Sequence, residues 1–257
     1  MGIKMIAMDL DGTLLRTDKT ISERTKNVLK ICREARIKVV YATGRGSSAG
    51  KVAATEIFDA GITMNGAVAK VDNNIVYCRL IPWQVARPIL MVCNEKGMRI
   101  TSEITGMHYS NFAVSDEWPH ITNFEIVDFA RHNVDAEKLY SPNLTPENKS
   151  FIERHLPNEL YLVITDDRGK PFGSILHKEA TKAKAVAELA RLWGVEQNEI
   201  ATFGDDLNDI DMLEYAGVGV AMGNALNEVK AVADAVCLSN DEDGIAKWLE
   251  NNILGEF

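Results

Sequence analysis

Short apolar runs alternate with amphipathic stretches in the first and last thirds of the chain. The apolar runs are nearly continuous, which predicts strands buried on both faces, as in a parallel sheet covered by helices. Strands are predicted at residues 3–8, 38–42, 200–203 and 218–221. Helices are predicted at about residues 22–35, 47–57, 182–193, 206–215, 225–233 and 241–251. For the helix at 182–193, Thr181 is the expected N-cap and Gly194 the expected stop. In such α/β sheets, ligands bind at the carboxyl ends of the strands.

The middle of the chain has a different pattern and composition. All 7 prolines lie between residues 82 and 171, and all 5 histidines lie between residues 108 and 177. Hairpins are predicted at residues 68–77, turning at 72–74, and at residues 161–177. Helices are predicted at residues 83–96 and after Thr145, where Pro146 takes the first helical position. We therefore predict a core formed by residues 1–82 and 179–257 and an inserted α+β domain at residues 83–178.

Composition narrows the classes of function. The formal net charge of −9 and the lack of a basic run argue against a nucleic-acid-binding surface. No apolar run approaches the length of a membrane span, and the first strand begins almost at the amino terminus, so we expect no membrane attachment, no signal peptide and a cytoplasmic location. The four cysteines show no metal-ligand spacing and are expected to be reduced core residues; they are Cys32, Cys78, Cys93 and Cys237. Nothing in the sequence indicates an oligomeric state.

Two carboxylates stand two residues apart at the end of the first predicted strand, in Asp9-Leu10-Asp11-Gly12-Thr13. Like charges this close raise one pKa unless a cation between them keeps both ionised. A solvated surface turn is the simpler interpretation, because Asp and Gly are common in turns. An EF-hand loop is excluded, because counting from Asp9 places Leu14 and Thr20 where that loop needs Gly and Glu.

Three further polar segments stand at predicted strand or helix ends. Thr43-Gly44-Arg45 follows the strand at 38–42, and Gly204-Asp205-Asp206-Leu207-Asn208-Asp209 follows the strand at 200–203. Lys182 begins a helix, where its charge opposes the helix dipole unless an anion lies nearby. Asp205 and Asp209 would repel each other across one helical turn without a cation. The acidic residues therefore indicate one cation-binding rim of the sheet, formed by Asp9, Asp11, Asp205, Asp206 and Asp209.

At these residues the sequence resembles the haloacid dehalogenase-like superfamily, whose four motifs occur here in the right order. Further segments resemble the Cof-type sugar-phosphate phosphatases; they are Asn65-Gly66-Ala67, Val220-Ala221-Met222-Gly223-Asn224-Ala225 and Asp241-Glu242-Asp243-Gly244. The resemblance covers the whole chain and implies a Rossmann-like α/β core with an inserted α+β cap that contacts the leaving group. Ala183 is a departure, because the family usually has Gly after the lysine of its third motif; this could alter how closely the helix start approaches phosphate.

The resemblance implies a Mg²⁺-dependent phosphatase acting on small phosphorylated metabolites, with sugar phosphates expected. Asp9 would be the nucleophile and form an aspartyl-phosphate. Asp11 would protonate the leaving alcohol and then deprotonate the attacking water. Mg²⁺ would be bound by Asp9, the backbone carbonyl of Asp11 and Asp205.

The resemblance also assigns the phosphate contacts. Thr43 and Gly44 of the second motif, with Lys182, would hold the phosphate oxygens. Asn208 would touch phosphate or a metal-bound water, and Asp209 would support Lys182 or the metal's waters. Arg45 is either a substrate contact or a surface residue. No histidine is expected to bind a metal.

Other functions stay open at the level of sequence. Gly44-Arg45-Gly46-Ser47-Ser48-Ala49 matches a dinucleotide-binding fingerprint, but it follows the second strand, and the next strand ends at Asn65 instead of an acid. A sugar-phosphate sensor without catalysis is disfavoured by Asp11, which only proton transfer requires. A phosphomutase on the same scaffold is the nearest alternative.

Overall fold

The computed structural model describes residues 2–46, 49 and 55–256. The chain divides into two compact units, Met1–Cys78 with Thr181–Phe257, and Arg79–Ala180. Each unit has its own sheet and its own hydrophobic clusters. Among the described residues, none of the helices combines the length and the apolar character that a bilayer span requires.

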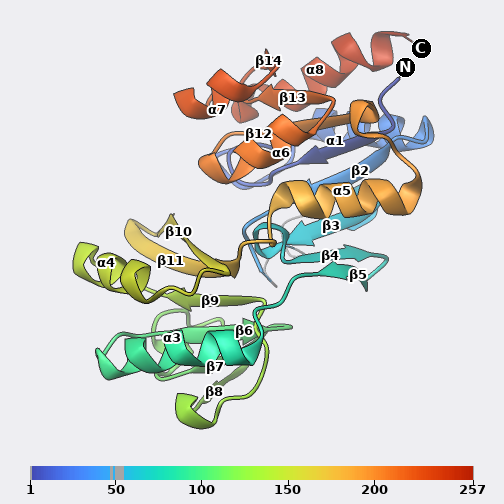
Figure 1. Ribbon diagram of the computed structural model, residues 1–257. Coiled ribbons are helices and arrows are strands. Elements are labelled where there is room, and N and C mark those ends of the chain that lie inside the picture. The colour runs from blue at the N-terminus through green and yellow to red at the C-terminus, as the bar shows by residue number, and fades with distance from the viewer. Residues whose placement is uncertain (1, 47–48, 50–54, 257) are drawn as a thin grey trace. The chain divides into compact units, whose positions relative to one another are not determined.

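The first unit contains an eight-stranded sheet in the order β14-β13-β12-β1-β2-β3-β4-β5 (Figure 1). Neighbouring strands are parallel from β14 to β3, whereas β4 and β5 are antiparallel. The hairpin predicted at residues 68–77 thus extends this sheet. The strands are β1 (Met5–Met8), β2 (Lys38–Ala42), β3 (Ala60–Thr63), β4 (Val68–Val71), β5 (Asn74–Cys78), β12 (Ile200–Gly204), β13 (Val218–Ala221) and β14 (Ala235–Val236).

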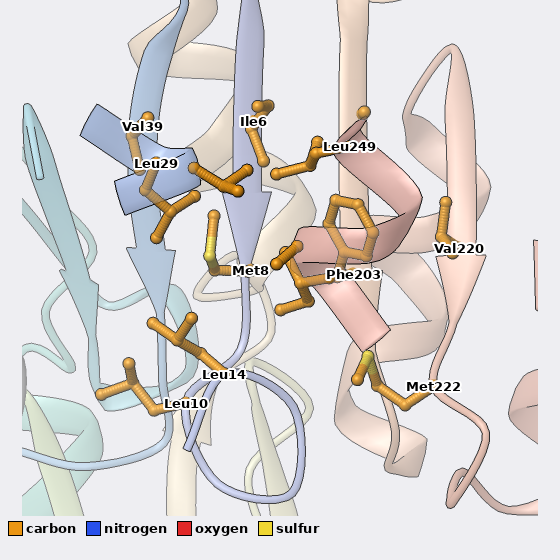
Figure 2. Packing of buried hydrophobic residues seen from close by; sticks show 14 of the residues in the cluster. Ile6, Met8, Leu10, Leu14, Leu29, Val39, Phe203, Val220, Met222 and Leu249 are labelled. Carbon is orange, nitrogen blue, oxygen red and sulfur yellow. The ribbon is translucent and has the colours of Figure 1, made fainter. Parts of the chain in front are cut away.

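Helices cover both faces of this sheet, which is why its central strands are continuously apolar. All four residues of β1 are buried: Ile6 and Met8 belong to one cluster, and Met5 and Ala7 to another on the opposite face. Figure 2 shows Ile6 and Met8 in the first cluster, which α1 and α8 also line. The second cluster includes residues of α5 and α6. The helices are α1 (Glu23–Glu34), α5 (Lys182–Trp193), α6 (Ile210–Tyr215), α7 (Asn227–Val232) and α8 (Gly244–Asn252).

The second unit contains a six-stranded sheet in the order β10-β11-β9-β6-β7-β8. Its strands pair antiparallel, apart from the parallel pair β7 and β8. Apolar residues of α3 (Trp83–Glu95) and α4 (Pro146–His155) pack with residues of β9 and β11 in one cluster. The strands are β6 (Thr101–Ile104), β7 (Met107–Ser110), β8 (Phe124–Ile126), β9 (Lys138–Ser141), β10 (Leu160–Asp167) and β11 (Lys170–His177). A parallel α/β core with an inserted α+β unit confirms the predicted fold class.

Several local expectations need correction. The helix predicted at 241–251 is broken, because Asp243 has φ 58° and α8 starts only at Gly244, after a short 3-10 helix. The first turn of the helix predicted at 206–215 is likewise 3-10, at Leu207–Asp209. Cys78 is exposed instead of lying in the core, because it ends the edge strand β5, whose side chains are largely exposed. Of the helix predicted at 47–57, residues 47–48 and 50–54 lie outside the described residues.

Candidate active site

The candidate site lies at the carboxyl ends of three neighbouring parallel strands. Asp9 follows β1, Thr43 follows β2, and Asp205 follows β12. Strand β1 pairs with both of the others, so the three strands end side by side (Figure 1). From β1, the sheet continues on one side through β2 and β3, which follow β1 in sequence. On the other side it continues through β12, β13 and β14, from the end of the chain. Such a change of strand order is where open α/β sheets bind ligands.

Lys182 joins two buried carboxylates. Its Nζ donates to Asp9 Oδ1 at 2.6 Å and to Asp209 Oδ1 at 2.5 Å. The side chain of Lys182, the first residue of α5 after the N-cap Thr181, is fully buried. Burial opposes its charge, but the neighbouring carboxylates of Asp209 and Asp9 outweigh this and raise the pKa of Lys182. A permanently charged ammonium is therefore held beside Asp9.

Burial also changes the pKa values of the carboxylates. It raises the pKa of Asp9 to about 8, against the opposing effect of Lys182, and Asp209 adds to the increase. It raises the pKa of Asp205 to about 6, with repulsion from Asp209 and Asp206 in the same direction. The three carboxylates of Asp9, Asp205 and Asp209 face one ammonium, so the cluster carries more negative than positive charge when ionised.

This cluster fits a hard divalent cation. Asp9, Asp205 and Asp209 each offer a carboxylate oxygen, and these atoms lie within 4.8 Å of one another. Carboxylate oxygens are the ligands that Mg²⁺ favours. Both oxygens of Asp209 already have protein partners, since Oδ1 accepts from Lys182 and Oδ2 accepts from the backbone N–H groups of Asp205 and Asp206 at 3.0 and 3.1 Å. Asp9 and Asp205 are consequently the better candidates for direct ligands, with Asp209 fixing the loop and Lys182.

The loop after β1 contacts the loop after β12. The Thr13 hydroxyl donates to Asp205 Oδ1 at 2.6 Å. Gly12 has φ 80°, and a Cβ there would collide with the Asp205 carboxylate, so the close approach requires glycine. Asn224 Nδ2 donates to the carbonyl of Gly12 at 2.7 Å. Two hydrogen bonds, between residues 192 and 212 positions apart in sequence, thus fix the turn that carries Asp9 and Asp11.

Asp11 is held by two cations. Arg45 donates from Nε to Asp11 Oδ2 at 2.5 Å and from Nη2 to Oδ1 at 2.6 Å, and Lys19 Nζ donates to Oδ1 at 2.8 Å. Arg45 is therefore partly buried beside the candidate site, with Asp11 as its partner, and a contact of Arg45 with substrate stays a prediction. Lys19 was missed from the sequence, because no local pattern marks a lysine that returns to a residue eight positions earlier.

The remaining predicted residues lie around the same strand ends. Thr43 is buried, and its Oγ1 accepts from the backbone N–H of Arg45 at 3.2 Å. Asn208 donates from Nδ2 to Asn65 Oδ1 at 2.9 Å. Ala183 donates its backbone N–H to Asp211 Oδ2 at 3.3 Å, so the helix start keeps a partner at the position where the family usually has Gly.

Comparisons with known proteins identify the family of the chain. The family model for haloacid dehalogenase-like hydrolases matches residues 6–249. The 5-amino-6-(5-phospho-D-ribitylamino)uracil phosphatase YitU of Bacillus subtilis is 30% identical, over 96% of each chain.

Two solved structures have the same fold. BT1666 of Bacteroides thetaiotaomicron, described among the phosphatases of the HAD superfamily, has a TM-score of 0.83 and 28% identity, over 97% of this chain and 95% of its own. The HAD subclass IIB sugar phosphatase BT4131 has a TM-score of 0.80 and 28% identity, over 99% of this chain and 100% of its own. With the family match, these likenesses show that the chain belongs to the haloacid dehalogenase-like hydrolases, as a phosphoric monoester hydrolase of the Cof type.

Proposed function

We propose that this protein hydrolyses small phosphorylated metabolites, with sugar phosphates and phosphorylated sugar alcohols as the expected class, by phosphoryl transfer to Asp9. The observation that carries the proposal is the buried pair of Asp9 and Lys182, 2.6 Å apart at the end of β1 and next to Asp205. A carboxylate beside a fixed ammonium and a candidate cation site is arranged to approach an anionic phosphate.

Asp9 supplies the nucleophilic oxygen. In the first step, this oxygen attacks phosphorus, the bond from phosphorus to the alcohol oxygen breaks, and the phosphoryl group remains on Asp9. In the second step, water attacks phosphorus, the bond from phosphorus to the Asp9 oxygen breaks, and inorganic phosphate is released. Asp11 gives a proton to the leaving alcohol in the first step and takes one from water in the second.

Lys182 and Thr43 stabilise the charge on the transferring group. Both side chains are buried, so their hydrogen bonds act in a medium of low dielectric constant. Their donor groups are also fixed in position before the reaction. Asp209 keeps Lys182 in position through its 2.5 Å contact. The Mg²⁺ ion, held by Asp9, Asp205 and the carbonyl of Asp11, would shield the nucleophile's charge from that of the phosphate.

The relatives support the substrate class. YitU is named for a substrate with a phosphorylated ribityl chain, and BT4131 is named a sugar phosphatase. Both names describe phosphate monoesters of polyhydroxy alcohols. Such alcohols are poor leaving groups, which matches the need for a general acid such as Asp11.

The test is phosphate release by the purified full-length protein. A panel of sugar phosphates, phosphorylated sugar alcohols, nucleotides and phosphodiesters would be assayed with Mg²⁺ and with excess chelator, and Asp9→Asn would control for contaminating phosphatases. We expect release from monoesters of sugars or sugar alcohols, dependent on Mg²⁺ and lost in Asp9→Asn. Turnover that persists in excess chelator would contradict the metal assignment, and equal turnover by Asp9→Asn would contradict the site.

A further inference from the structure

The turn that follows β3 has an unusual backbone. Met64, Asn65 and Gly66 have φ values of 53°, 52° and 101°, so three consecutive residues occupy the left-handed region. Non-glycine residues there carry an energetic penalty, lower for Asn than for Met. Met64 and Asn65 are also buried. A conformation of this kind persists only where the surrounding structure enforces it, and such outliers concentrate at functional sites.

Residues 64–66 of this turn contact three of the segments that form the candidate active site. The backbone N–H groups of Met64 and Asn65 donate to the carbonyls of Arg45 and Thr43, each at 3.0 Å. The left-handed conformation aims both N–H groups at the loop after β2. A Cβ on Gly44 would lie 2.9 Å from Asn65 Oδ1, so the two loops approach as closely as glycine permits.

The other two contacts are with the elements that carry Lys182 and Asn208. A Cβ on Gly66 would collide with the carbonyl of Thr181, the N-cap of α5, so the turn also packs directly against the residue before Lys182. The side chain of Asn65 accepts the hydrogen bond from Asn208 Nδ2 at 2.9 Å. This bond joins residues 143 positions apart and uses one of the two N–H groups of Asn208.

We propose that Asn65 is a positioning residue for phosphoryl transfer, which acts by fixing the side-chain amide of Asn208. The inference rests on the proposed function, since Asn208 is the residue expected to touch phosphate or a metal-bound water. An amide bound at one N–H cannot rotate freely, so its remaining N–H and its oxygen keep one direction. Donors that are fixed before the reaction stabilise developing charge without further reorganisation.

Another asparagine of the first unit shows what a conformational role looks like. Asn73 also has a positive φ, at 66°, but it is exposed. Asn73 lies in the tight turn between β4 and β5, where Asn is favoured because it tolerates the left-handed conformation. Asn65 differs because it is buried and its side chain has a partner in the active site. The turn conformation alone therefore does not account for the residue.

The test is Asn65→Gly, because glycine adopts the left-handed conformation without strain while the side-chain amide is removed. Asn73→Gly is the matched control, with the same chemical change at a positive φ in the same unit. We expect Asn65→Gly to lower kcat on the best substrate about tenfold or more with KM within a few-fold of wild type, the range seen when supporting residues are removed. Its thermal midpoint should stay close to that of Asn73→Gly, whose kinetics should match wild type.

A double-mutant cycle then asks whether Asn65 acts through Asn208. Asn208→Ala alone and Asn65→Gly with Asn208→Ala should have nearly the same kcat, because the amide that Asn65 fixes is already gone. Additive losses, or an Asn65→Gly variant with wild-type kcat, would overturn the inference while an active wild type leaves the proposed function intact. A wild type that releases phosphate from no monoester would overturn both.

Discussion

Arg45 holds both carboxylate oxygens of Asp11, at 2.5 Å through Nε and 2.6 Å through Nη2. Partial burial alone would raise the pKa of Asp11, but the hydrogen bonds from Arg45 and Lys19 outweigh it and lower this pKa to about 2. Asp11 is therefore ionised at neutral pH. This state suits a general base, whereas the general acid of the first step needs a proton on the same group. Asp11 must loosen its contact with Arg45 before it can protonate a leaving alcohol.

This relationship predicts the effect of Arg45→Met on leaving groups. Without the guanidinium, the pKa of Asp11 rises toward its ordinary value of about 4, and more of the acid form is present near neutral pH. Alkyl phosphates need the acid, and aryl phosphates need it less. In single-turnover phosphoryl transfer, the ratio of the alkyl rate to the aryl rate should rise several-fold, even if lost phosphate contacts slow both reactions.

Two further variants serve as controls for the ratio of alkyl to aryl rates. Asp11→Asn removes the acid, so the same ratio should fall well below that of wild type. Arg191→Met changes an exposed arginine at the far end of α5 and should leave the ratio unchanged. An Arg45→Met ratio equal to that of wild type would show that Arg45 does not govern the protonation of Asp11.

The raised pKa values of Asp9, about 8, and Asp205, about 6, predict a pH-dependent effect of Mg²⁺ on stability. Between about pH 4 and pH 8, Asp9 and Asp205 bind more protons in the metal-free folded protein than in the unfolded chain, so their contribution to the free energy of unfolding falls as pH rises. A cation that binds the ionised carboxylates competes with these protons. The increase in thermal midpoint caused by Mg²⁺ should consequently grow with pH across this range.

Thermal unfolding in chelator and in Mg²⁺ at several pH values checks this. Asp205→Asn should lose most of the Mg²⁺ effect, because it removes one candidate ligand, while Asp206→Asn, an exposed neighbour, should keep it. A Mg²⁺ effect that is constant with pH, or largest in acid, would contradict the proposed ligands.

The second unit is proposed to choose the substrate. All residues assigned to chemistry lie in the first unit, and phosphate contacts are common to every monoester, so they cannot discriminate between alcohols. The unit Arg79–Ala180 has its own buried cluster and can be exchanged as one piece for that of a related phosphatase. The chimera should prefer a different phosphorylated metabolite while keeping its need for Asp9 and Mg²⁺. A folded chimera with the parent's preference would place specificity in the first unit.

Local patterns sufficed to predict the core of the fold and the sheet edge at which the candidate residues meet. Continuous apolar runs identified β1, β2, β12 and β13, and parallel strands bring their carboxyl ends to one edge. Thr181 and Gly194 marked the ends of α5 correctly, since one caps the first turn and the other has φ 65°. These features depend on neighbours within a few residues, which the sequence displays directly.

Features that depend on distant partners were not predictable in this way. Strands β6 to β9 are short and partly polar. Because buried positions in them hold polar residues such as Glu103 and His108, the sequence does not show the apolar alternation that predicts a strand. The contacts of Thr13 with Asp205 and of Asn65 with Asn208 join loops that only the folded sheet brings together. Likewise, nothing local indicates that Arg45 turns to Asp11.

The central claim is that Asp9 becomes phosphorylated, and acid-quenched labelling tests it most directly. The Asp11→Asn variant would be mixed with a ³²P-labelled aryl phosphate and Mg²⁺, because it still accepts the phosphoryl group from a good leaving group but hydrolyses the intermediate slowly. We expect label to accumulate on the peptide containing Asp9, and Asp9→Asn to lower wild-type turnover by about a thousandfold or more. Absence of protein-bound label, or equal label in a variant that carries both substitutions, would contradict the account.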